Sequence, residues 1–357
     1  MRLSANRLFG FSGLTLLGLM SGQEESQGDA LRRFLLERSP LVEADLAAID
    51  EGQIITQVLG GEDKRAMAVL GVVRLAVPGD FSGEQLSDPE LLVLSSLGPE
   101  FGTFSDPPRI EDVEDLNFPR QDVEALRTCR VGACDVKLPA AVIERFRREI
   151  DWESDKGAAN AAALAREMLV DYVASYRAAG NAALGAYADK EEVLSIAEGF
   201  ELLLEDAKPL AELVPSLHAY LINYPRQRPD RAEDLVYWVR ENFGIKSVVS
   251  LYHMIVYRTG ADPASPVVIA SKQLYASHYF QAVLNVMAVF DASGERGQPS
   301  SYLISVQSAR FDGELGGFKR IIVRSRLNRE VAGDLESLRD RLEASYRASL
   351  TAEAGSR

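Results

Sequence analysis

The C-terminal third of the sequence, residues 246–350, is the feature that most constrains the fold. It contains four apolar runs separated by short stretches rich in Gly, Pro, Asp and Ser, a pattern typical of consecutive antiparallel strands. Leu and Val then recur at steps of three and four residues, which predicts one long amphipathic helix over about 319–350. The predicted strands are 246–258, 267–276, 280–291 and 301–309.

Both faces of these predicted strands carry apolar side chains. In the first strand, Val248 and Tyr252 on one face alternate with Val249 and Ile255 on the other. Each face of the sheet therefore needs a cover. The final helix covers one face, and either the helical middle of the chain or a ligand covers the other.

The N-terminal part of the chain supplies further predicted strands. Two β-rich runs, 53–59 and 65–77, flank Gly60-Gly61 and predict a hairpin, and 100–105 predicts a return strand.

After residue 109 the pattern changes from strands to helices, because apolar residues recur there at helical spacing. The helices expected there are 140–150, 158–179, 190–205, 210–224 and 231–243.

This order of elements resembles the START-like, Bet v 1-like (SRPBCC, helix-grip) superfamily. The likeness rests on the strand 65–77, short helices over 78–97, the return strand, the meander 246–309 and the closing helix. It implies an α+β fold in which a curved antiparallel sheet grips a long C-terminal helix and leaves an apolar cavity between them. Residues 106–243 then form a large helical insertion. The superfamily has no short signature, so the resemblance assigns no functional residue.

On this basis the chain divides into four parts. Residues 1–22 are a predicted signal peptide, and 31–105 supply the N-terminal helices and the first strands of the sheet. Residues 106–243 form the helical insertion, and 245–350 form the meander and the closing helix.

The signal peptide is predicted from a basic, apolar, polar order of residues. Arg2 and Arg7 precede the apolar run 8–20, and a polar stretch begins at Ser21. The apolar run is short for a membrane-spanning helix. We therefore expect a periplasmic or secreted protein; the alternative is a buried or membrane-resting N-terminal helix.

The two cysteines, Cys129 and Cys134, enclose Gly132, which gives a tight turn the backbone freedom it needs. In an exported protein a disulfide is the leading interpretation, and two free thiols are the alternative. The pair lacks a nearby His and the spacing of a redox Cys-x-x-Cys motif, so zinc binding and redox activity are less well supported.

Charge and motifs argue against several functions. The chain of 357 residues has a formal net charge of −14 and lacks clustered runs of Lys or Arg, which argues against nucleic-acid binding. The sequence has no Gly-x-Ser-x-Gly elbow, no His-Glu-x-x-His motif and no phosphate-binding Gly loop. It therefore predicts no catalytic residue, metal site or cofactor.

Five side chains of the predicted meander are candidates for ligand contact: His253, Tyr257, Tyr275, His278 and Tyr279. Each combines an apolar body with a polar tip, which suits the mouth of a cavity. As ordinary strand and turn residues they need no function. An enzyme that uses His253 or His278 as acid or base is the weakest hypothesis, because the sequence places no partner carboxylate or nucleophile by spacing.

The closing helix begins with a basic cluster that includes Lys319, Arg320 and Arg324. These residues either meet anionic lipid headgroups or pair with acidic groups of the protein. Taken together, the sequence favours an exported protein that binds or carries an apolar, lipid-like ligand between the sheet and the last helix. The alternative is a non-enzymatic envelope interaction or scaffold module with a filled core.

Overall fold

The computed structural model describes residues 26–59, 63–87, 100–243, 246–292 and 298–355. The predicted signal peptide and the Gly60-Gly61 turn lie outside these ranges. Of the short helices expected over 78–97, the described residues include one, α3 (Gly79–Gln85).

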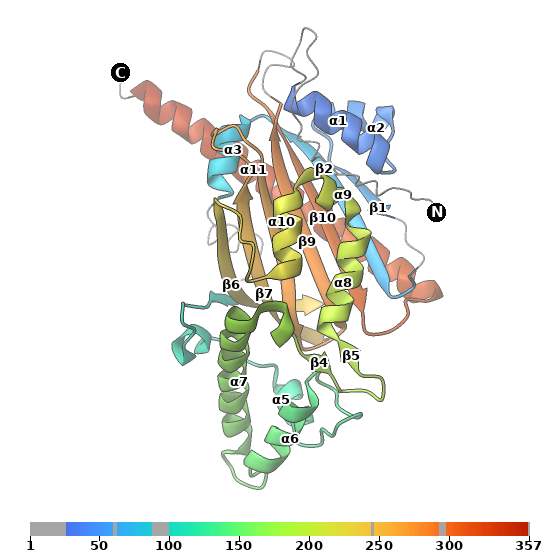
Figure 1. The fold of residues 1–357 in the computed structure, drawn as a ribbon, viewed down its shortest axis with the longest axis vertical. Helices are drawn as coiled ribbons and strands as arrows, with labels where there is room; N and C mark the ends of the chain where they lie inside the picture. Colours follow the sequence, from blue (N-terminus) through green and yellow to red (C-terminus); the bar gives the residue numbers. More distant parts are fainter. Residues whose placement is uncertain (1–25, 60–62, 88–99, 244–245, 293–297, 356–357) are drawn as a thin grey trace, which may run out of the picture.

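Within the described residues an eight-stranded antiparallel sheet forms the centre of the molecule (Figure 1). The strand order is β1-β2-β10-β9-β8-β7-β6-β3. The predicted hairpin and the four C-terminal strands are confirmed as neighbours in this sheet. The strands are β1 (Ile55–Leu59), β2 (Ala66–Leu75), β3 (Phe101–Thr103), β6 (Ala232–Phe243), β7 (Lys246–Arg258), β8 (Val267–Ala276), β9 (Phe280–Asp291) and β10 (Ser301–Phe311).

The long C-terminal helix, α11 (Gly317–Gly355), packs across one face of the sheet, which we call the inner face. Its stripe of Val331, Leu335, Leu338 and Leu342 is fully buried. The stripe contacts β2, β1 and β10, at one side of the sheet. The fold class predicted from the sequence is confirmed: a curved antiparallel sheet grips the last helix.

Two groups of helices cover the opposite, outer face. The first group, α1 (Gln27–Arg38) and α2 (Glu43–Asp50), shares a core with β2 and β10. The second group, α8 (Ile196–Asp206), α9 (Lys208–Leu213) and α10 (Pro215–Asn223), packs against β7, β8 and β9. Figure 1 shows the second group in front of the sheet and α11 behind it.

The remaining helices of the insertion extend beyond one end of the sheet (Figure 1). The longest, α7 (Gly157–Ala179), packs against β6 and β7 and also against α5 and α6. The short elements are η1 (Ile110–Val113), α5 (Arg120–Leu126), α6 (Ala140–Glu149), η2 (Gly180–Ala183), β4 (Ala186–Tyr187) and β5 (Leu194–Ser195). None of the helices in the described part of the chain is long and apolar enough to cross a bilayer.

Strand β6 differs from the sequence prediction, which placed a helix at 231–243. It pairs with β7 along its whole length, and β3 then pairs with β6 at the edge. The cause is the run 235–239, Leu-Val-Tyr-Trp-Val, whose β-branched and aromatic side chains suit a sheet buried on both faces. Tyr237 and Val239 lie in the core beneath α11, whereas Val236 and Trp238 lie in the core beneath α7.

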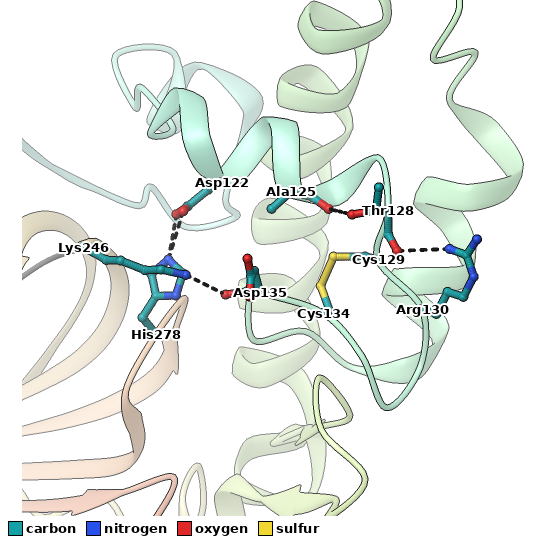
Figure 2. Close-up of a disulfide and its surroundings, with 9 residues drawn as sticks. All are labelled: Asp122, Ala125, Thr128, Cys129, Arg130, Cys134, Asp135, Lys246 and His278. Carbon is teal, nitrogen blue, oxygen red and sulfur yellow. Dashed lines mark hydrogen bonds and ion pairs between the residues drawn. A yellow bond between two sulfur atoms is a disulfide. The ribbon is translucent and has the colours of Figure 1, made fainter.

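A disulfide joins Cys129 and Cys134 in the segment between α5 and α6 (Figure 2), as the sequence predicted. Gly132 takes a φ of +82° in the enclosed turn, a conformation that favours glycine. The bond lies beside a small core that α5, α6 and α7 share, and the next residue, Asp135, accepts a hydrogen bond from Lys246 Nζ at the start of β7 (Figure 2).

Candidate functional site

A cavity of about 370 Å³ lies between the inner face of the sheet and α11. It forms because α11 lies over β1, β2 and β10, so that β6 to β9 are not fully covered by the helix. The strand side of the cavity is partly apolar. Its apolar lining includes Val248, Met254, Ile269, Phe280, Val283 and Met287.

A row of polar side chains crosses this apolar surface. Ser271 of β8 pairs with Asn285 of β9, and Asn285 pairs in turn with Gln307 of β10, so the three residues lie side by side on neighbouring strands. Gln307 Nε2 donates a hydrogen bond to Asp334 Oδ2 of α11 at 3.1 Å. The polar row therefore reaches from the sheet to the helix. Ser305, which is also small and polar, adds to the same lining.

Two stacked tyrosines extend the polar surface toward β6. The rings of Tyr237 and Tyr252 lie 5.3 Å apart, and both residues line the cavity. The Tyr252 hydroxyl accepts a hydrogen bond from Gln273 Nε2 at 3.1 Å. The Tyr237 hydroxyl is hydrogen-bonded to Ser271, so side chains of the sheet hold both hydroxyl groups in place. The floor of the cavity is thus a fixed array of donors and acceptors set among apolar groups.

Three carboxyl groups line the cavity: Glu241 of β6, and Glu330 and Asp334 of α11. Glu330 is paired with Arg326, whose Nε lies 2.6 Å from a carboxylate oxygen. Glu241 is exposed to the open space of the cavity, and the surrounding protein atoms displace part of its hydration. This desolvation and the nearby Glu330 and Asp334 carboxylates raise the pKa of Glu241 to about 7.

Burial also raises the pKa of Asp334, to about 6, against the opposing effect of the hydrogen bond from Gln307. Near neutral pH, Glu241 and Asp334 therefore change between a neutral donor and an anionic acceptor. The arrangement can bind a molecule that has an apolar body and polar groups. Among the described residues, no group of three or more His, Cys, Asp or Glu side chains is placed to hold a metal ion.

None of the five residues proposed from the sequence for ligand contact lines this cavity. His253 points to the outer face and is fully buried; its Nε2 lies 2.8 Å from Asp234 Oδ1 and its Nδ1 lies 2.9 Å from the Tyr176 hydroxyl. Desolvation lowers the pKa of His253 despite the Asp234 carboxylate. A neutral ring that donates to Asp234 and accepts from Tyr176 fits both contacts. Tyr257, four residues along β7, packs beside the α8–α10 core.

The other three candidates are also separated from one another. His278 is buried, with Nε2 3.0 Å from both carboxylate oxygens of Asp122 (Figure 2). Tyr275 packs beneath α7 and beside β4 and β5. Tyr279 packs beside the inner core, and its hydroxyl accepts from the backbone N–H of Lys246 at 3.1 Å. His278 and Tyr275 thus join the insertion to the end of the sheet, whereas Tyr279 contacts the strands of the sheet, and the three do not form one site.

The sequence contains a signal for the cavity in the polar residues of its strands. Ser271, Asn285, Ser305 and Gln307 interrupt otherwise apolar strands at alternate positions. A polar residue at a core-facing position needs a hydrogen-bond partner or a space to face. The choice between the two faces of each strand required knowing which face α11 covers.

A second hollow, of about 320 Å³, lies on the outer face between α1 and the α8–α10 group. Its lining is mostly apolar and comes from five strands, β1, β2, β8, β9 and β10, as well as the helices. Leu70, Val268, Leu284, Phe290 and Val306 form part of its floor. We call it the outer groove; it lies on the opposite face of the same sheet from the inner cavity.

Fold and cavity together define the class: an α+β protein whose curved antiparallel sheet grips a C-terminal helix and leaves a partly polar cavity beneath it. Family models and curated proteins give no match to this chain. Among solved structures, the chain is similar to the Zhui aromatase/cyclase from Streptomyces sp. R1128, at 14% identity and a TM-score of 0.25. The match covers 42% of this chain and 87% of the other. At that TM-score it assigns neither a family nor a ligand.

Proposed function

We propose that the protein binds a small molecule with an apolar body and polar substituents in the cavity between the sheet and α11. The observation that carries the proposal is the row Ser271–Asn285–Gln307, which places polar side chains on an otherwise apolar floor beneath the helix. A sheet face that only packed against helices would gain stability from apolar side chains at these positions. A lipid-like molecule with a hydrogen-bonding group fits this lining, as do other amphipathic molecules of similar size.

Native mass spectrometry after gentle purification tests the proposal. We expect a non-covalent adduct of defined mass that is released on unfolding, because a partly apolar site beneath α11 retains such a ligand through purification. In a Ser305→Phe variant the added ring occupies the cavity, so the adduct should be lost. A wild-type protein that carries no adduct, and that gains none when incubated with lipid extract, would contradict the proposal.

We further propose that the protein is exported. The basic, apolar, polar order of residues 1–25 supports this proposal, and so does the Cys129–Cys134 disulfide, since such bonds persist in oxidising compartments. Cell fractionation with N-terminal sequencing of the mature protein tests it. Export predicts a new N-terminus near residue 22 in the envelope or medium; a full-length chain confined to the cytoplasm would contradict export.

A further inference from the structure

The first turns of α11 expose a group of large apolar side chains. Phe318, Ile321 and Ile322 are 75%, 64% and 51% exposed, and their spacing places them on one face of the helix. The opposite face of the same turns holds Val323 and Leu327, which pack into the inner core. The helix is therefore fixed to the sheet on one side and presents bare apolar surface on the other. Such a group, unlike scattered exposed apolar residues, marks an interaction surface.

Two arginines lie in the same turns: Arg324 is exposed and flanks the apolar group, whereas Arg320 is half-buried and lies toward the side of Val323 and Leu327. Arg320 and Arg324 form no ion pair with another residue in the described part of the chain, whereas Arg326, two residues beyond Arg324, pairs with Glu330. The sequence left open whether this basic cluster pairs internally or meets lipid headgroups. For Arg320 and Arg324 the structure shows no internal partner among the described residues. The side chain of Lys319 lies outside what the structure describes.

We propose that this end of α11 docks on an anionic lipid bilayer. Phe318, Ile321 and Ile322 enter the boundary between headgroups and acyl chains, and Arg324 at the edge of this group contacts the anionic headgroups, with Arg320 adding to the positive charge of the same turns. Local charge favours anionic lipid over a second copy of this chain, because a symmetric contact between two copies would bring Arg320 and Arg324 against the same two arginines, whereas anionic headgroups complement them.

The docking surface lies next to the inner cavity. Arg326, which lines the cavity, lies one turn beyond Ile322 on the same helix. A molecule that leaves the bilayer near this end of α11 thus has a short path to the cavity. Docking on the bilayer does not require a ligand in the cavity.

Co-sedimentation with vesicles tests the proposal. The wild-type chain should sediment with vesicles of equal parts phosphatidylcholine and phosphatidylglycerol, and far less with phosphatidylcholine alone. Replacing Arg320 and Arg324 by Glu should weaken binding by about thirty-fold or more, since each lost arginine removes about a factor of five near an anionic surface. Raising the salt concentration should also weaken wild-type binding, because salt screens these contacts.

A triple variant, Phe318→Ser, Ile321→Ser and Ile322→Ser, tests the apolar contribution. It should lose at least about ten-fold in vesicle affinity, because buried apolar area contributes to interfacial binding. The three side chains are exposed, so circular dichroism and thermal unfolding should match wild type. If wild type fails to sediment with anionic vesicles, or if both variants bind as well as wild type, the proposal is wrong.

A second triple variant serves as the matched control. Val42→Ser, Val193→Ser and Leu213→Ser remove exposed apolar residues of comparable exposure away from α11, and should leave vesicle binding unchanged. Sedimentation velocity separates the remaining alternative. A wild-type dimer that the α11 triple variant converts to monomer, without vesicle binding by either, would assign the patch to self-association and overturn the membrane proposal.

Discussion

Gly71 of β2 lies directly beneath Val331 of α11. A Cβ atom at position 71 would lie 2.5 Å from Val331 Cγ1 and 2.7 Å from Leu335 Cδ1, closer than side-chain carbons approach one another. The helix therefore rests on β2 at the one glycine of that strand, which lets the two backbones approach closely. This contact fixes the distance between α11 and the sheet at the side of the molecule away from the cavity.

Gly71→Val should destabilise the protein and disturb the cavity. The added side chain forces α11 away from β2, so we expect the free energy of unfolding to fall by about 1–3 kcal/mol. Urea unfolding measures the change. Gly333→Ala, on the exposed side of α11 with no atom within 4 Å of the new Cβ, should instead raise stability by about 0.5–1 kcal/mol. Equal effects of the two substitutions would contradict close packing at Gly71.

The free energy of unfolding should fall as pH rises from 4.5 to about 7, the range between the pKa values of Glu241 in the unfolded and folded protein. The folded protein holds this proton up to a pKa of about 7, whereas the unfolded chain releases it near its ordinary value of 4.5. Between these values the folded state binds more protons, so stability decreases with increasing pH. Asp334, with a pKa of about 6 against 3.8, acts in the same direction.

The Glu241→Gln variant isolates this effect. It should show a shallower loss of stability than wild type when urea unfolding is compared at about pH 5 and about pH 8. Glu336→Gln, on an exposed position of the same helix as Asp334, is the control and should keep the wild-type slope. An unchanged slope in Glu241→Gln would show that the cavity does not desolvate this carboxyl group.

The buried amine of Lys272 predicts the opposite pH dependence at higher pH. Lys272 is fully buried on the outer face, hydrogen-bonded to Asn181, with Nζ 4.0 Å from the centre of the Phe200 ring. Desolvation lowers the pKa of Lys272 from 10.5 to about 7. Between these values the unfolded chain binds a proton that the folded protein lacks, so stability rises with pH.

Lys272→Met should remove this rise while keeping a side chain of similar length. We expect wild type to gain about 2 kcal/mol between about pH 7 and about pH 9, and the variant to gain much less. Lys64→Met, at an exposed lysine, controls for the loss of one charge. If the variant and wild type rise together in urea unfolding, the amine is charged in the folded protein.

Removing the Cys129–Cys134 disulfide should destabilise the insertion. In the chain-entropy view, a closed loop of this length contributes about 2 kcal/mol by restricting the unfolded chain. A Cys129→Ser, Cys134→Ser variant should therefore unfold at lower urea concentration, and a reductant should shift wild type toward the variant. A reductant that left wild-type stability unchanged would argue that the bond is not formed in solution.

The sequence predicted the strands of the C-terminal third and the closing helix because their periodicities are long and uninterrupted. The sequence prediction failed at β6, because the acidic residues on either side of its short apolar run also fit the pattern of an amphipathic helix. Pairing with β7 decided the outcome, and pairing between strands is a tertiary effect that local periodicity does not contain.

The site was harder to predict than the fold. The alternation in β7 separated His253 from Tyr252, but which of the two faces α11 depends on how a helix far along the chain docks. Polar row residues such as Asn285 were visible as interruptions of apolar strands. Glu241 and Asp334 gave no local signal, because they meet only in the folded protein.

Binding of a neutral apolar dye, N-phenyl-1-naphthylamine, tests the central claim most directly. Ser305 and Val306 are neighbours on β10 that face the inner cavity and the outer groove respectively, so replacing each by Phe fills one space and leaves the other open. We predict saturable binding to wild type and to Val306→Phe, and at least about ten-fold weaker binding to Ser305→Phe. Absence of saturable binding to wild type, or loss of binding in Val306→Phe alone, would contradict a ligand site beneath α11.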